Sequence, residues 1–196
     1  MLMKHRKTDA GTGPRAVLPG VYLIDPCRST LGFSVRHGVV SSVCGTFTDL
    51  AGILKFDGAR PTGFEARVSV RSGSLRTGTG RRDAHITGPD LLDADTFPLM
   101  SFRSRGAVRA GDERFRLHGH LRIKDIELPL GIDLTLGGGA PGPNGENHVG
   151  FVGTAALRRS DWGLNWDMPR GSRDVLTGDT VKLTLDVSAV ALERAA

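Results

Sequence analysis

The sequence predicts an all-β protein that folds as one antiparallel, up-and-down barrel of about eight strands, with one short helix between strands. Three observations support this fold class. Apolar residues recur at every second position in one segment after another, the connections between these segments are mostly short and rich in Gly and polar residues, and residues 79–98 break the pattern with the only candidate helix. Short connections favour pairing between consecutive strands, and closure of the sheet removes its exposed edges.

The first strongly alternating segment covers residues 31–37. Its apolar face consists of Leu31, Phe33 and Val35, and His37 ends the same row. The other face carries Gly, Ser and Arg, and this two-residue period is typical of a half-buried strand. The alternation resumes at residues 43–48 and again at residues 53–56. The first three strands are therefore expected to form an antiparallel meander.

The remaining strands follow the same rule. They are expected at residues 64–71, 99–110, 115–123, 128–136, 149–157 and 181–189. Residues 79–98 contain clustered polar residues, a Leu pair and a Pro, which predicts one short helix and an irregular return. Small residues occupy four core-facing positions, namely Gly45, Gly119, Gly153 and Ala155. They either leave room for a cavity or only relieve crowding at tight barrel corners, and the periodicity does not distinguish the two.

The length of 196 residues suits one domain, and we expect a leader at residues 1–19 followed by a single barrel domain at residues 20–196. The net charge is +5, but the basic residues are mostly scattered singly along strand-like segments. They are expected on solvated strand faces, so no nucleic-acid binding is predicted. No apolar run has the length of a secretory signal or a membrane span, which predicts a cytoplasmic protein without stable membrane insertion.

Neither the cysteines nor the paired histidines predict a special site. Cys27 and Cys44 fall on neighbouring predicted strands, where one bridge is geometrically conceivable, but free buried thiols are the expectation. His118 and His120 are two residues apart on one strand, a spacing at which two imidazoles can share a metal. Alternation turns both outward and no third ligand is evident, so no metal site is predicted.

Several longer stretches carry a recognisable order of motifs. The stretch YLIDPCRSTLGFSVRHGVVSSVCGTF contains an Asp, a Ser, a Phe-x-Val-x-His strand end and a following Gly-x-Phe. It is followed in order by AGILKFDG, SLRTGTGRRDAHITGPDLLDADTFPLMSFRS, LHGHLRIKDIELPLGIDL and LRRSDWGL. Together these stretches resemble, nearly end to end, the YceI-like family of small lipocalin-type barrels that bind polyisoprenoid lipids. Cys27 stands where a His of the family is expected, and the secretory leader of many relatives is not seen.

The resemblance implies a lipocalin-like barrel that binds, stores or transports a long-chain isoprenoid lipid without catalysis and without a cofactor. The lipid would be an isoprenoid quinone or a polyprenyl phosphate, and the family's tendency to pair implies a homodimer. With the inward rows as lining and polar groups near the mouth, the expected ligand-binding residues are Leu31, Phe33, Val35, His37, Val43, Phe47, Phe56, Val68, Arg82, His85, Phe102, Leu121, Phe151 and Trp162.

Each polar or rim candidate has a structural alternative. His37 offers an imidazole nitrogen to a quinone carbonyl or a phosphate, or else is satisfied by neighbouring backbone. Arg82 or His85 could meet an anionic head group, whereas Arg82 could equally pair with Asp83 or cap its segment. Trp162 forms an apolar rim at the entrance or closes one end of the core, and the second role is preferred.

A rival function from another class is an enzyme on the same scaffold, an isomerase or hydrolase that uses His37 with an acidic partner, since a fold alone does not determine function. A carboxylate or hydroxyl within hydrogen-bond reach of His37 inside the cavity would favour this rival. No nucleophile and base are convincingly paired in the sequence, so the non-catalytic lipid-binding role is the leading hypothesis.

Overall fold

A computed structural model describes residues 19–37, 41–56, 63–141, 146–165 and 177–192. The strands are β1 (Gly20–Ile24), β2 (Thr30–His37), β3 (Ser41–Phe47), β4 (Leu50–Phe56), β5 (Glu65–Arg71), β6 (Leu75–Arg76), β7 (Leu99–Arg109), β8 (Arg114–Ile123), β9 (Ile126–Pro141), β10 (Asn147–Arg158) and β11 (Thr177–Ala191). The helices are α1 (Gly80–Thr87) and the 3-10 turns η1 (Pro26–Arg28), η3 (Ser72–Ser74) and η4 (Arg159–Trp162).

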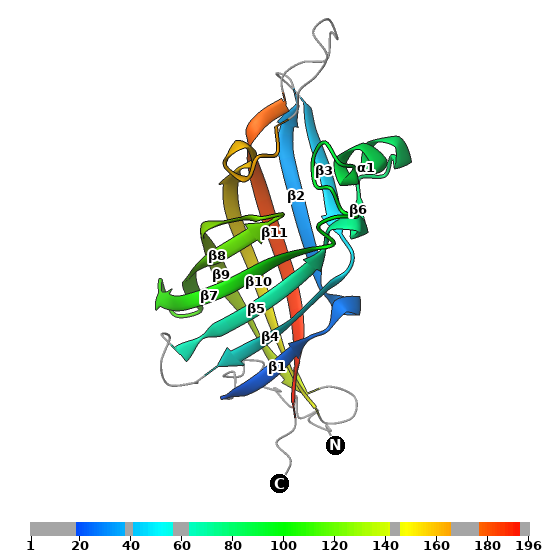
Figure 1. Ribbon diagram of the computed structural model, residues 1–196. Helices are drawn as coiled ribbons and strands as arrows, with labels where there is room; N and C mark the ends of the chain where they lie inside the picture. The colour runs from blue at the N-terminus through cyan, green and yellow to red at the C-terminus, as the bar shows by residue number, and fades with distance from the viewer. Residues whose placement is uncertain (1–18, 38–40, 57–62, 142–145, 166–176, 193–196) are drawn as a thin grey trace, which may run out of the picture.

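The strands form one antiparallel sheet that closes on itself (Figure 1). The order is β1-β4-β5-β7-β8-β9-β10-β11-β2-β3-β6, and β11 also pairs with β1. β11 thus pairs with β2 over residues 177–186 and with β1 over residues 189–191, so β1 and β2 act as one interrupted strand. The closed ring contains eight strands that neighbour each other in chain order, which confirms the predicted up-and-down barrel.

The interruption between β1 and β2 has a local cause. Pro26 opens η1 and lacks a backbone N–H for the ladder, while the Asp25 carboxylate accepts a 2.9 Å hydrogen bond from the backbone N–H of Cys27. The chain resumes the sheet at Thr30, and the Ser29 hydroxyl donates to the backbone carbonyl of Ser188 at 3.1 Å. The turn therefore shifts the strand along its partner without opening the barrel.

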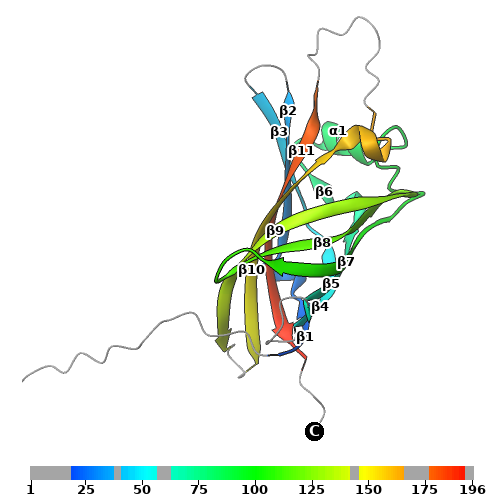
Figure 2. The ribbon, with the colours of Figure 1, turned by 90° about the vertical axis from the view of Figure 1, so that its left-hand side faces the viewer.

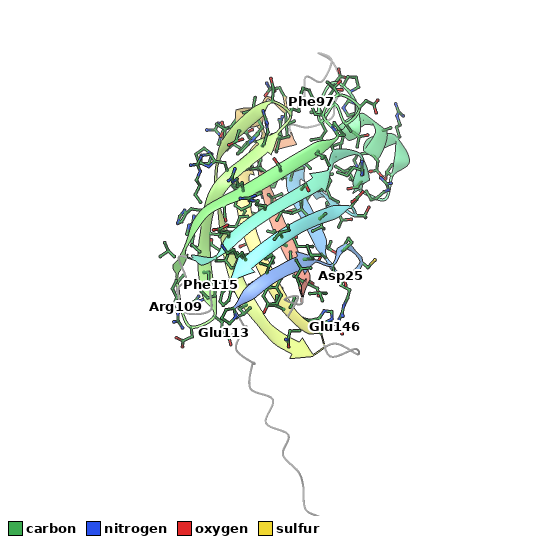
Figure 3. The ribbon with its side chains drawn as sticks, turned by 60° about the horizontal axis from the view of Figure 1, so that its bottom comes forward. Asp25, Phe97, Arg109, Glu113, Phe115 and Glu146 are labelled. Atoms are coloured by element: carbon green, nitrogen blue, oxygen red, sulfur yellow. The ribbon has the colours of Figure 1, made fainter. Side chains whose placement is uncertain are left out.

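The helix predicted within residues 79–98 is confirmed as α1, which lies beside the end of the barrel where β2 ends and β3 begins (Figures 1 and 2). The Asp83 carboxylate accepts hydrogen bonds from the backbone N–H and the hydroxyl of Thr77. The segment after the helix turns back over the barrel, with Leu91 and Leu92 buried and Phe97 at the end of the molecule opposite Arg109 and Phe115 (Figure 3).

The core-facing glycines relieve crowding. A Cβ atom at Gly45 would lie 2.5 Å from the Phe33 ring, and one at Gly119 would lie 2.5 Å from the Phe102 ring. Cβ atoms essentially never come this close to other heavy atoms, so the large side chains occupy the space that each glycine leaves. The geometry supports relief of crowding, which is one of the two interpretations that the sequence leaves open. The crowding arises between side chains of neighbouring strands along the barrel, not at tight barrel corners.

The expectation of buried thiols is wrong. Cys27 and Cys44 are both free and exposed. Cys27 lies in η1, outside the ladder, and Cys44 lies on the outward row of β3 between the half-buried Val43 and Gly45. The alternation of β3 required this outward position. Residues 1–18 of the expected leader lie outside the described residues.

The arginines that are scattered in the sequence are gathered by strand pairing. Arg67 on β5 lies directly opposite Arg103 on β7, and Arg103 lies directly opposite His120 on β8. Arg105 on β7 and Arg122 on β8 are exposed on the same side of the sheet. The expectation of singly placed basic residues is therefore wrong for this part of the outer surface.

Candidate functional site: an apolar cavity in the barrel

The barrel contains a cavity of about 220 Å³. This volume far exceeds the roughly 10–15 Å³ that holds a single water molecule. Four successive inward positions of β11, from Val181 to Val187, line it, and at roughly 3.3 Å per residue they span about 20 Å of strand. Ile86 of α1 and Leu164 after η4 line it at the end where these two elements lie. The cavity is therefore elongated along the barrel.

The cavity wall is almost entirely apolar. It consists of Ile24, Leu31, Phe33, Val35, Val43, Phe47, Leu54, Phe64, Ala66, Val68, Val70, Leu75, Ile86, Leu91, Leu92, Met100, Ser101, Phe102, Leu117, Leu121, Ile123, Leu130, Ile132, Leu134, Phe151, Leu157, Arg159, Leu164, Val181, Leu183, Leu185 and Val187. Within the described part of the chain, only Ser101 and Arg159 contribute polar side chains to this wall, and Ser101 is exposed on an outward position of β7. Arg159 thus provides the charged side chain of the described cavity wall.

Arg159 stands at the junction of β10 and η4. Its Nη1 donates to the backbone carbonyl of Leu164, and its Nε donates to the backbone carbonyl of Gly178 at 3.3 Å. These bonds join η4 to the residues that follow it and to β11. The sequence interpretation missed Arg159 because its position at a strand end carries no periodic signal, although it lies within the LRRSDWGL stretch.

Asp179 of β11 fixes η4 over this end of the cavity. Its carboxylate accepts from Arg158 Nε at 2.9 Å, from the Ser160 hydroxyl at 2.9 Å and from the Ser160 backbone N–H at 3.1 Å. The hydrogen bond from Arg158 and those from Ser160 lower the pKa of the Asp179 carboxyl to about 2. The carboxylate is therefore ionised at neutral pH, when it holds η4 in place.

Trp162 closes this end of the core. It is 3% exposed, and its indole N–H donates to the backbone carbonyl of Leu121 at 3.1 Å. It does not line the cavity, so the geometry favours the core-closing alternative over an entrance rim. A buried indole generally needs such a hydrogen-bond partner.

Nine of the residues predicted to bind ligand line the cavity. They are Leu31, Phe33, Val35, Val43, Phe47, Val68, Phe102, Leu121 and Phe151. Phe56, Arg82, His85 and Trp162 are outside its lining, and Phe56 instead packs edge-on against Phe64 with ring centroids 6.1 Å apart. His37 pairs through its backbone with Ser41 and Thr177, but its side chain lies outside the described part of the structure. Contact of any of these residues with a ligand stays a prediction.

Arg82 organises the start of α1. Its Nε donates to the Thr77 hydroxyl at 2.7 Å, and its Nη2 donates to the Thr77 carbonyl at 2.8 Å. The capping alternative therefore describes its contacts better than pairing with Asp83, which instead accepts from Thr77. His85 is exposed, and the neighbouring Ile86 is the α1 side chain that reaches the cavity.

The described residues form no metal-binding cluster and bring no acid–base pair to the cavity wall. The described cavity lining includes no carboxylate, thiol or imidazole. No three His, Cys, Asp or Glu side chains among the described residues come together in a way that would hold a metal ion. His118 is exposed on the outward row of β8, as the alternation predicts.

Fold and cavity together define a small antiparallel barrel built around an apolar interior. The YceI-like domain family model matches residues 22–189, and the chain belongs to this family. The UPF0312 protein of Shewanella oneidensis is 31% identical over 157 residues, which cover 79% of this chain and 82% of the relative. Among the described residues, no helix has the length and apolar composition needed to cross a membrane.

Solved structures share the fold. The crystal structure of Burkholderia cenocepacia BcnA superposes with a TM-score of 0.73 at 19% identity, covering 84% of this chain and 98% of that chain. A polyisoprenoid binding domain from Saccharophagus degradans, implicated in plant cell wall breakdown, superposes with a TM-score of 0.70 at 12% identity, covering 89% of this chain and all of that chain. At these identities the likeness concerns the fold alone.

Proposed function

We propose that this protein binds a long-chain isoprenoid lipid without catalysis, with the apolar tail along the barrel axis, and thereby stores or transports it. The observation that carries the proposal is the elongated cavity whose described wall is apolar apart from Ser101 and Arg159. Family membership supports it, as does the likeness to a structure whose name describes a polyisoprenoid binding domain.

The chemistry of the wall suits such a tail. Each buried methylene contributes about 0.8 kcal/mol, and a branched hydrocarbon chain makes many dispersion contacts with Leu, Val, Ile and Phe side chains. A polar ligand would lose its hydrogen bonds to water without finding new ones along most of this wall. The proposed ligand therefore carries its polar group at one end only.

The head group is proposed to lie at the η4 end, near Arg159. A guanidinium donates well to phosphate oxygens and also to a quinone carbonyl, so this residue is compatible with both head groups. The proposal extends to a homodimeric, cytoplasmic protein whose residues 20–196 act as one domain and which needs no cofactor. Light scattering on the purified protein measures its oligomeric state directly. A monomer at micromolar concentration would contradict the proposed homodimer.

Titration with three purified lipids tests the binding proposal. A long-chain polyprenol, a ubiquinone and a polyprenyl phosphate are each presented in dilute detergent, and displacement of a fluorescent apolar dye reports occupancy. We expect displacement by at least one of the three, and a preference for the quinone or the phosphate over the alcohol would support a role for Arg159. If none of them enters the barrel, the proposal is wrong.

A further inference from the structure

The outer surface of the barrel carries a basic face that the proposed cavity does not use. We define the basic face as the exposed side chains of Arg67 on β5, Arg103 and Arg105 on β7, and Arg122 on β8. These strands are adjacent in the sheet, at about 4.8 Å between neighbours, and Figure 1 shows them side by side. Cross-strand register gathers the four residues, which are far apart in the sequence.

Among the described residues, no carboxylate forms an ion pair with the arginines of the basic face. Arg67 and Arg103 lie directly opposite each other, and Arg122 is a diagonal neighbour of Arg103 because it pairs with Ser101. In the described part of the chain, none of the four arginine side chains makes a hydrogen bond or an ion pair. β7 and β8 contain no Asp or Glu.

Carboxylates are found only at the border of this face. Glu65 is paired with Lys55 at 3.9 Å, and Asp133 is paired with Arg116 at 2.8 Å. Glu127 lies opposite Arg122 on β9 but forms no ion pair with it among the described contacts. Like charges directly opposite each other on a sheet destabilise it, so the opposed Arg67 and Arg103, which have no ion-pair partner among the described contacts, point to an anionic partner outside the chain.

We propose that the basic face docks the protein onto an anionic membrane surface, from which it takes up or to which it delivers its ligand. This inference rests on the proposed function, because a long isoprenoid resides in a bilayer and a carrier must approach one. Arginines near an anionic bilayer each strengthen binding about fivefold. The face provides four of them on three adjacent strands of one sheet.

Other occupants fit the face less well. A second copy in a symmetric pair would oppose cation to cation. Residues 1–18 contain four Lys and Arg residues and one Asp, so they do not complement a cationic surface. Single-stranded nucleic acid requires aromatic platforms beside the charges, whereas Phe102 is buried in the cavity wall and Phe115 is half-buried.

Flotation with lipid vesicles tests the docking. The full-length protein is mixed with vesicles of phosphatidylcholine alone, or of phosphatidylcholine with phosphatidylglycerol, at low and at high NaCl. The test variant is Arg67→Gln/Arg103→Gln/Arg122→Gln. The matched control is Arg28→Gln/Arg81→Gln/Lys182→Gln, which removes the same charge from exposed residues elsewhere. Circular dichroism verifies that both are folded.

We expect the wild type to float with the anionic vesicles only, and to be released by high salt because the interaction is screened. The test variant should bind the anionic vesicles on the order of 100-fold more weakly, because it lacks three arginines that each contribute about fivefold. The control variant should lose much less affinity for these vesicles. Equal losses in both variants, or equal binding to neutral vesicles, would overturn the docking proposal. So would arginine-dependent binding to an oligothymidine probe without binding to vesicles.

Mass spectrometry of lipid extracted from the same wild-type sample separates this inference from the proposed function. Co-purified isoprenoid without vesicle binding would overturn the docking and leave the lipid-binding function standing. Vesicle binding without any isoprenoid, and without uptake on titration, would refute the lipid-binding function, and with it the reason for the docking.

Discussion

Replacing Val68 by Thr places one hydroxyl in the apolar cavity wall with almost no change of shape. Val68 lines the cavity and pairs across the sheet with Gly52 and Phe102. A lipid tail packed against this position would desolvate the new hydroxyl without offering it a hydrogen bond. Burial of an unpaired hydroxyl costs about 1–3 kcal/mol in proteins, and each 1.4 kcal/mol corresponds to a tenfold change in affinity. We therefore expect Val68→Thr to weaken lipid binding by about 5- to 150-fold.

Val152→Thr provides the matched control, because Val152 lies on the outward row of β10 and is 50% exposed. The same chemical change at that position leaves the hydroxyl in water, and lipid affinity should not change. Dye displacement by a long-chain polyprenol measures the affinities, and urea unfolding establishes that both variants are folded under the assay conditions. An affinity of Val68→Thr within twofold of the wild type would refute the view that the lipid tail packs against this wall and excludes water from it.

Three further changes test the packing around the cavity. Gly119→Ala places a Cβ 2.5 Å from both the Phe102 ring and the backbone carbonyl oxygen of Arg103, and it should lower the free energy of unfolding by about 1–3 kcal/mol in urea titrations, whereas an unchanged midpoint would mean that the ring and the backbone both shift without cost. Trp162→Phe leaves the Leu121 carbonyl without its indole donor and should lower the free energy of unfolding by about 1–3 kcal/mol in urea titrations. An unchanged free energy of unfolding would contradict the core-closing role of Trp162. Asp179→Asn should lower the melting temperature at neutral pH. Because the pKa of Asp179 is about 2 when folded, below the ordinary 3.8, its contribution is complete above pH 4 and is lost as the pH falls through 2. The melting temperatures of the wild type and Asp179→Asn should therefore converge in acid. A difference that persists there would refute the view that the ionised Asp179 carboxylate stabilises the protein.

The barrel could be predicted from the sequence because each strand has one apolar and one polar row. The inward positions of Phe33, Val68 and Phe151 follow directly from this alternation. Cys44 was expected to be buried from the general preference of thiols, against the alternation of its own strand, and it is exposed. A local period is a better guide to orientation than the average behaviour of a residue type.

Features that depend on non-local geometry could not be predicted. Alternation places Phe56 on an inward row but does not tell how far the cavity extends, and Phe56 packs beyond its lining. Arg159 is held at the cavity by hydrogen bonds to the backbone carbonyls of Leu164 and Gly178. The spacing of residues in the sequence does not predict these contacts. The opposition of Arg67 and Arg103 depends on the register between β5 and β7, which are separated along the chain by η3, β6 and α1.

Extraction of the purified protein with organic solvent, followed by mass spectrometry, tests most directly whether the cavity holds an isoprenoid lipid. The expected result is a long-chain isoprenoid in a fixed ratio to the protein, lost or much reduced in Val68→Thr and retained in Val152→Thr. A protein that carries no such lipid, and that takes up neither polyprenol, ubiquinone nor polyprenyl phosphate when titrated, would contradict the proposed function.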